Sequence, residues 1–246
     1  MPNQLILRIE IKRPSWSNVS KAYREINEVG KKEYDEVLKE SELHDTETYR
    51  AAELIQAQKR YEKVGGQALS EFNRDSNTYI NTCALQVSYA LNYGGMPLMD
   101  DKVKLTSGTK LKGKNDYKYY TGVSGIKELL LENWKRLKPY SRTNNKDFYK
   151  VFYNHKKEPF ETLANSYGNI LNEQRVEEIC RDNLNFFNTL QSLGIKGIVT
   201  MNIDGWGDAE GHTTLWNGNH FLDDTNYLND GRKFVFVREL CFWELK

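Results

Sequence analysis

An apolar helical pattern with a cysteine near its start occupies residues 81–92, which read NTCALQVSYALN. Asn81 or Thr82 is a suitable N-cap, and Gly94-Gly95 ends the pattern as glycine does at helix C-termini. We expect a helix over 82–93 with Cys83 in its first turn. The helix dipole and the unpaired backbone amides at such a position favour a thiolate, so Cys83 is a candidate nucleophile.

A partner for this thiol is found far downstream, in residues 205–218, which read GWGDAEGHTTLWNG. His212 begins an apolar, strand-like segment that ends at the strong turn dipeptide Asn217-Gly218. An imidazole held on a strand can take the proton of a thiol. His44 and His155 lie in charged stretches and are weaker candidates; His220, beside the turn, is the serious rival.

The imidazole also needs an orienting group on its second nitrogen. Asp223 and Asp224 follow the turn. If the turn folds 212–216 back against 221–227, an aspartate there approaches the His212 ring. From composition alone, a buried cysteine on an apolar helix is more often a core residue than a nucleophile, and the chain would then be a binding module without a nucleophile.

The order of the remaining patterns predicts an α+β fold. Helical periodicity covers residues 17–63, 82–93, 124–137 and 172–193, and Ser124 is a plausible N-cap for the third of these helices. The strand candidates are 4–12, 195–201, 211–216, 221–227 and 234–243. Residues 100–122 are expected to form loops with short strands. No repeat or linker divides the chain, so we expect a single domain over 1–246.

Bulk composition narrows the function classes. The 246 residues include 35 basic and 34 acidic side chains, a net charge of +1, so no global field favours nucleic acid or a membrane surface. No run approaches the ~20 apolar residues of a membrane span. Met1–Glu10 lacks the features of a signal peptide, so the chain is expected to be made in the cytoplasm and exported, if at all, by other machinery.

The three cysteines are Cys83, Cys180 and Cys241. Their odd number and wide spacing argue against a disulfide framework and against zinc. Cys180 and Cys241 lie on apolar patterns and are interpreted as small core residues. No metal or organic cofactor is expected.

Five blocks, in order, resemble the type VI secretion amidase effectors of family four, which are papain-like, NlpC-related peptidoglycan hydrolases. The blocks are Arg13–Trp16 with Lys21–Tyr23, Asn81–Asn92, Gly125–Leu129, Gly197–Val199 with Gly205–Gly218, and Phe242–Leu245. Together they cover about half of the chain, and their order makes the resemblance specific.

The resemblance implies a papain-like domain with helices flanking an antiparallel sheet. Cys83 would be the nucleophile, His212 the general base and Asp223 the orienting acid, with Asp224 as the alternative. Such antibacterial toxins cleave the amide between D-glutamate and meso-diaminopimelate in wall stem peptides. They are injected into a rival's periplasm by secretion machinery, and a cognate immunity protein protects the producer.

The chain also departs from this pattern. Extra material is expected around 30–70 and 138–185 as helical insertions. Phe221 and Thr225 cannot form the disulfide that brackets the acidic residue in some relatives, and Gln86 stands where arginine is common. A papain-like deamidase, transglutaminase or protease acting on proteins is therefore an alternative, alongside the non-enzymatic binding module.

Overall fold

The computed structural model describes residues 12–41, 43, 45–99, 101–134, 149–150, 173–204, 211–231 and 235–246. The predicted strand at 4–12, His44, His155 and most of the predicted 138–185 insertion lie outside these residues. Within them, no helix is long and apolar enough to span a membrane.

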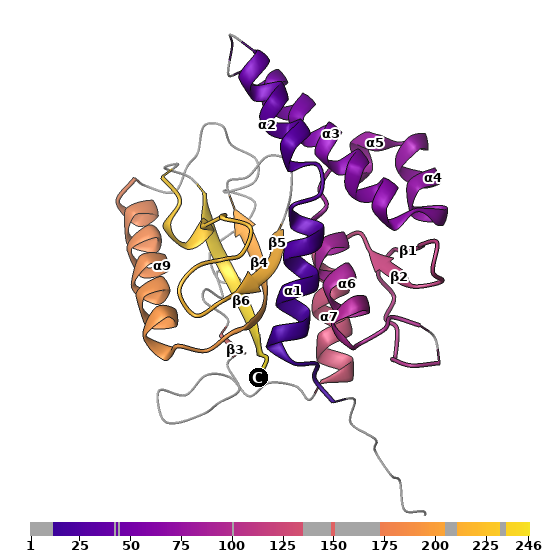
Figure 1. The fold of residues 1–246 in the computed structure, drawn as a ribbon. Helices are drawn as coiled ribbons and strands as arrows, with labels where there is room; N and C mark the ends of the chain where they lie inside the picture. The colour runs from indigo at the N-terminus through magenta and orange to yellow at the C-terminus, as the bar shows by residue number, and fades with distance from the viewer. Residues whose placement is uncertain are drawn as a thin grey trace, which may run out of the picture.

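An antiparallel sheet separates two helical layers (Figure 1). Its strand order is β3 (Tyr149–Lys150), β6 (Phe236–Glu244), β4 (Gly197–Asp204) and β5 (Gly211–Trp216). Helix α9 (Glu173–Leu193) packs on one side, and α1 (Trp16–Asn27), α6 (Cys83–Gly94) and α7 (Val123–Asn133) pack on the other. The α+β fold class is thus confirmed, as are the helix around Cys83 and the strand that begins beside His212.

Alternation along the strands explains why both faces of the sheet are covered. Ile198 and Trp243 face the α1, α6 and α7 layer, whereas Val199 and Phe242 face α9. Side chains on successive strand residues point to opposite faces, so a strand that is apolar at every position needs a partner on each side. All six residues of β5 are buried, which ties this edge strand to the α6 layer.

Helix α6 is the central helix of the molecule. Every residue from Cys83 to Asn92 is buried, as expected for a helix without a polar face. Its polar side chains hold neighbouring segments: Ser88 Oγ accepts the Tyr120 amide at 2.9 Å, and Asn92 Oδ1 accepts the Leu98 amide at 2.7 Å. Gly95 ends the helix at φ 113°, a backbone conformation that L-residues rarely adopt.

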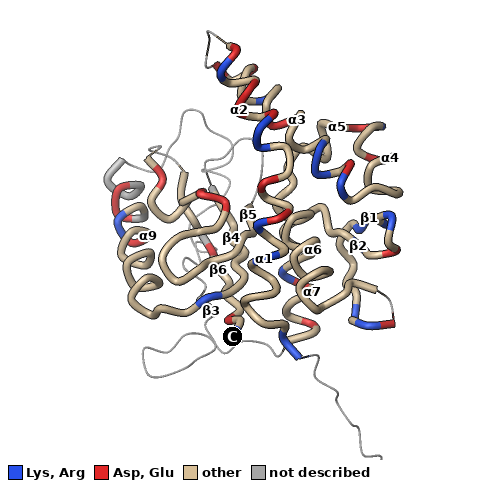
Figure 2. The backbone as a smooth tube through the Cα atoms, viewed as in Figure 1, with Lys and Arg blue, Asp and Glu red and all other residues tan. Residues whose placement is uncertain are grey.

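A more peripheral group of helices and one hairpin lies beside the α1–α6 pair (Figure 1). It comprises α2 (Lys31–Glu40), α3 (Thr46–Val64), α4 (Gly66–Arg74), α5 (Ser76–Tyr79), β1 (Lys110–Lys112) and β2 (Lys118–Tyr120). Charged residues are dense along α2 and α3 (Figure 2), and α2 has no fully buried residue. Helix α3 nevertheless contributes Ala57 and Tyr61 to a core cluster shared with α1 and α6.

Three local predictions were wrong. Helix α7 begins at Val123 with Gly122 as its N-cap, so Ser124 lies inside the first turn. The 221–227 segment forms only an isolated bridge from Phe221 to Trp216, followed by turns and the 3-10 helix η2 (Tyr227–Asn229). Cys180 is half-buried rather than part of the core, whereas Cys241 is fully buried as predicted.

Candidate active site

The strand β5 fixes the position of His212. Gly211 precedes it, and a Cβ atom there would lie 2.5 Å from the Met201 carbonyl oxygen, so only glycine permits this approach between β4 and β5. His212 pairs with Met201 in the ladder and is 6% exposed. The imidazole is therefore carried by a rigid strand that packs directly on α6.

Cys83 is the first residue of α6 and is 5% exposed. Its amide donates to Asn81 Oδ1 at 3.2 Å. Thr82 is the N-cap by backbone position, but its side chain makes no capping hydrogen bond to the helix. Asn81 therefore supplies the polar contact expected at this terminus, from one residue outside the N-cap.

The three predicted site residues come together. Asp223 Oδ2 lies 2.7 Å from His212 Nε2, and the Cys83 thiol is close enough to the same ring to raise its pKa. Because Nε2 faces the carboxylate, Nδ1 is the ring nitrogen left for the thiol. The order thiol, imidazole, carboxylate is the one required for an imidazole that accepts a proton and is oriented by an acid.

The charged forms of His212 and Asp223 stabilise each other although both side chains are buried. Burial opposes protonation of His212, but the Asp223 carboxylate, which accepts a hydrogen bond from the ring, and the neighbouring Cys83 outweigh it and raise the pKa of His212 to about 10. Burial likewise opposes ionisation of Asp223, yet His212 and hydrogen bonds from threonines hold its pKa below the usual value. The pair is thus an imidazolium–carboxylate ion pair in the resting site.

Further side chains orient the Asp223 carboxylate. The Tyr23 hydroxyl donates to Oδ2 at 3.3 Å and shares a 3.0 Å hydrogen bond with Thr214 Oγ1. Thr225 donates to Oδ1 from its hydroxyl at 2.8 Å and from its amide at 3.3 Å. Burial, and then the nearby Asp223 charge, raise the pKa of Tyr23 well above its usual range, so the phenol stays a donor.

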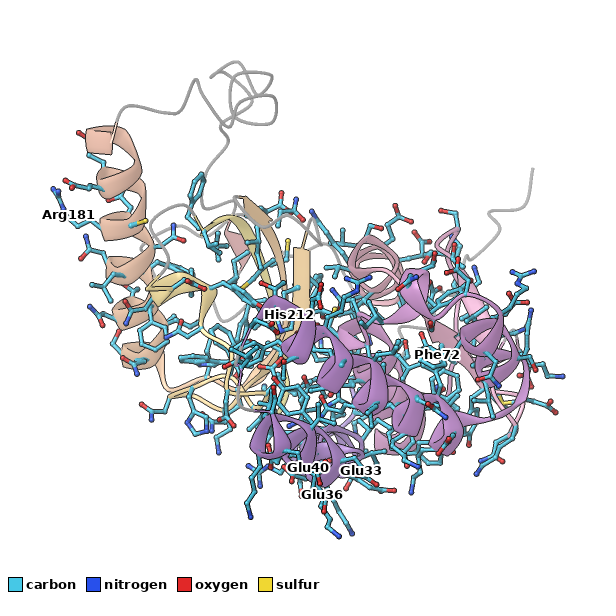
Figure 3. The ribbon with its side chains drawn as sticks, turned by 90° about the horizontal axis from the view of Figure 1, so that it is seen from above. Glu33, Glu36, Glu40, Phe72, Arg181 and His212 are labelled. Atoms are coloured by element: carbon cyan, nitrogen blue, oxygen red, sulfur yellow. The ribbon has the colours of Figure 1, made fainter. Side chains whose placement is uncertain are left out.

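The alternatives lie elsewhere. Asp224 is exposed, with its amide bonded to the Phe221 carbonyl oxygen and a φ of 61°. His220 is exposed and contacts Asn217. His212 instead lies near the middle of the molecule, away from the glutamates along α2 (Figure 3).

Sequence reasoning missed three supporting residues: Tyr23, Thr214 and Thr225. Thr214 was detectable, because it lies two residues after His212 on a strand and therefore points to the same face. Tyr227, whose ring centroid is 5.1 Å from that of His212, was assigned to a strand candidate but not to the site. No local pattern marks Tyr23, which reaches the site from α1.

No group of three or more His, Cys, Asp or Glu side chains in the described part of the chain could hold a metal ion. Proton transfer and nucleophilic attack are the chemistry that the assembled groups offer.

No family model and no curated protein matches the chain. Solved structures do. The type VI effector–immunity complex Tae4–Tai4 from Enterobacter cloacae is 19% identical, with a TM-score of 0.53 over 96% of this chain and 100% of that one. Tae4 from Salmonella typhimurium, in complex with Tai4 from Enterobacter cloacae, is also 19% identical, with a TM-score of 0.54 over 95% of this chain and all of that one.

At this identity the likeness concerns the fold. The chain has the fold of these Tae4 effectors, and the prediction of a papain-like α+β architecture is confirmed.

Proposed function

We propose that the chain is a cysteine amidase that hydrolyses a peptide amide of the bacterial cell wall. The observation that carries the proposal is the arrangement of Cys83 at the start of α6 beside the His212 ring, which is hydrogen-bonded to Asp223. Core packing alone does not require an ion pair buried beside a thiol, because apolar residues of similar volume fill a core without the free-energy cost of desolvating two charges.

In the proposed reaction the proton of the Cys83 thiol has passed to His212 before attack, and the Cys83 thiolate attacks the amide carbon. The carbonyl oxygen becomes an oxyanion near the N-terminus of α6, where backbone amides and the helix dipole stabilise negative charge. In the free protein Asn81 Oδ1 accepts the hydrogen bond of the Cys83 amide, so the substrate oxygen must replace Asn81 Oδ1 as the acceptor of that amide.

Collapse of this intermediate breaks the carbon–nitrogen bond, and the His212 imidazolium gives its proton to the leaving amine. The acyl group is then a thioester on Cys83. Water attacks the thioester while His212 accepts a proton, which releases the carboxylic acid and restores the thiol. Asp223, held by Tyr23 and Thr225, keeps the ring oriented throughout.

The substrate class rests on two supports. One is the fold shared with Tae4 effectors that are solved with the immunity protein Tai4. The other is the ordered set of sequence blocks around Cys83 and His212. We infer that the bond cleaved joins D-glutamate to meso-diaminopimelate in the stem peptide. We also infer that the protein is a toxin, which a type VI system delivers into the periplasm of a target bacterium, and that a cognate immunity protein binds it. A single catalytic domain over 1–246, with insertions around 30–70 and 138–185, completes the proposal.

Digestion of purified sacculi tests this proposal. The wild-type protein should release fragments whose masses, by mass spectrometry, place a new amine on diaminopimelate, and Cys83→Ala should release none. Cys180→Ala is the matched control, because it removes a half-buried thiol far along the chain and should digest normally. Undiminished digestion by Cys83→Ala would overturn the mechanism. An unchanged wall with a modified protein substrate would favour the deamidase, transglutaminase or protease alternative.

A further inference from the structure

Arg60 is a buried cation that the proposed reaction does not use. It lies on α3 and is 8% exposed. Nη1 donates to Thr82 Oγ1 at 2.8 Å, and Nη2 donates to the Asn27 carbonyl oxygen at 2.9 Å. Nε has no hydrogen-bond partner among the described residues. A guanidinium buried on uncharged oxygens requires compensation from nearby anions.

Most of the groups that interact electrostatically with Arg60 belong to the active site. Burial lowers the pKa of Arg60 to about 10, and interactions with Tyr23, Asp223 and Cys83, and then with Glu28 at the end of α1, oppose this decrease. The side chain therefore stays charged at neutral pH. When Cys83 is a thiolate and His212 an imidazolium, the four charges of Arg60, Asp223, His212 and Cys83 sum to zero; without Arg60 the same cluster carries a net negative charge.

Arg60 also joins the two helices that meet at the site. Asn27 is the last residue of α1, and Thr82 is the N-cap of α6. The planar guanidinium can serve both acceptors at once, which an ammonium does less well. Thr82 Oγ1 also accepts from Gln86 Nε2 at 3.3 Å, so the hydroxyl is turned to these donors and does not cap the first amides of α6.

Several of the described elements near Cys83 contribute a titratable or charged group. These groups are His212 from β5, Asp223 from the turn after it, Tyr23 from α1, and Arg60 and Tyr61 from α3. Among these groups, Arg60 is the cation whose charge does not depend on the proton that Cys83 and His212 exchange. It is thus suited to stabilise negative charge at the start of α6, both before and after attack.

We propose that Arg60 is a positioning residue that clamps the α6 N-terminus to α1 and favours negative charge on the Cys83 sulfur and on the oxyanion that replaces it. This role rests on the proposed amidase function. It predicts that the guanidinium acts through Thr82 and through its charge, without contacting substrate.

The test measures iodoacetamide alkylation of Cys83 against pH, in variants that also lack Cys180 through Cys180→Ala. Arg60→Met should move the midpoint of the alkylation profile upward by about one pH unit, so that about tenfold less thiolate is present at a given pH. With wall peptide as substrate, kcat should fall about tenfold while KM stays within about twofold. Arg60→Lys should keep the midpoint near that of the wild type but lower kcat, because one amine cannot span both acceptors.

Arg50→Met is the matched control. Arg50 lies on the same helix and is exposed, with its guanidinium on Asn77, so this variant should match the wild type in both assays. Thr82→Val removes the acceptor but keeps the charge of Arg60; it should shift the midpoint and kcat in the same direction as Arg60→Met, and Thr82→Ser should restore both.

A folded Arg60→Met protein with the wild-type midpoint and kcat would overturn the inference. If circular dichroism shows that Arg60→Met does not fold, wild-type behaviour of Thr82→Val would overturn it instead. Failure of the proposed function has a different signature: wild-type protein that alkylates rapidly but leaves sacculi intact. The two results are therefore distinguishable.

Discussion

Asp223→Asn should change how the stability of the protein depends on pH. In the wild type, burial opposes the charged imidazole, but Asp223 and Cys83 raise the pKa of His212 from 6.5 to about 10. One pKa unit corresponds to about 1.4 kcal/mol, so this increase corresponds to about 5 kcal/mol of folding free energy. Because the folded pKa is the higher one, the contribution is fully present below pH 6.5 and is lost as pH rises to 10.

The asparagine removes the carboxylate and leaves burial as the dominant influence on the ring. The pKa of His212 in the variant should then fall to its ordinary value or below, and its stability should be nearly flat between pH 6.5 and 10. Urea unfolding at pH steps across this window measures both proteins. The wild-type free energy of unfolding should decline relative to the variant by several kcal/mol, with a slope approaching about 1.4 kcal/mol per pH unit.

Asp224→Asn is the control, because Asp224 is exposed and its positive φ is one that asparagine tolerates. Its curve should follow that of the wild type. Parallel curves for the wild type and Asp223→Asn over the whole window would refute the reasoning, since they would mean that the His212–Asp223 contact does not stabilise the imidazolium.

Three other predictions follow from the same geometry. Tyr23→Phe removes one hydrogen bond from Asp223 and one from Thr214, so the free energy of unfolding should fall by about 1–2 kcal/mol and kcat on wall peptide about tenfold; unchanged kcat would exclude Tyr23 as a support. Gly211→Ala forces a Cβ against the Met201 carbonyl oxygen and should cost about 1–3 kcal/mol in urea unfolding, whereas Gly231→Ala, which has open space, should cost nothing measurable. His212→Gln should lower kcat at least about 10³-fold while His220→Gln retains it, and a comparable loss in both would contradict the site.

The elements that the sequence predicted best are those with continuous apolar patterns. Helix α6 and strand β5 are buried along their whole lengths, so their hydrophobic runs and glycine boundaries marked them clearly. The turn after β5 was harder: Asp223 was expected on a paired strand, yet it reaches His212 from a turn that follows the single bridge at Phe221.

What the sequence could not predict depends on contacts between distant segments. Tyr23 and Asp223 are 200 positions apart, and Arg60 meets Thr82 across 22 residues. An arginine in a charge-rich helix is ordinarily a solvated residue, and nothing local distinguishes Arg60 from Arg50. Only the packing of α3 against α1 and α6 buries the first and leaves the second exposed.

The central claim is that Cys83 carries the acyl group of the substrate. The wild-type protein should be mixed with wall stem peptide, quenched in acid during turnover and digested for mass spectrometry. The account predicts a thioester adduct, with the mass of the acyl fragment, on the peptide that contains Cys83, and no adduct in His212→Gln. Cleavage of the stem peptide with the acyl group on another residue, or turnover that persists in Cys83→Ala, would contradict it.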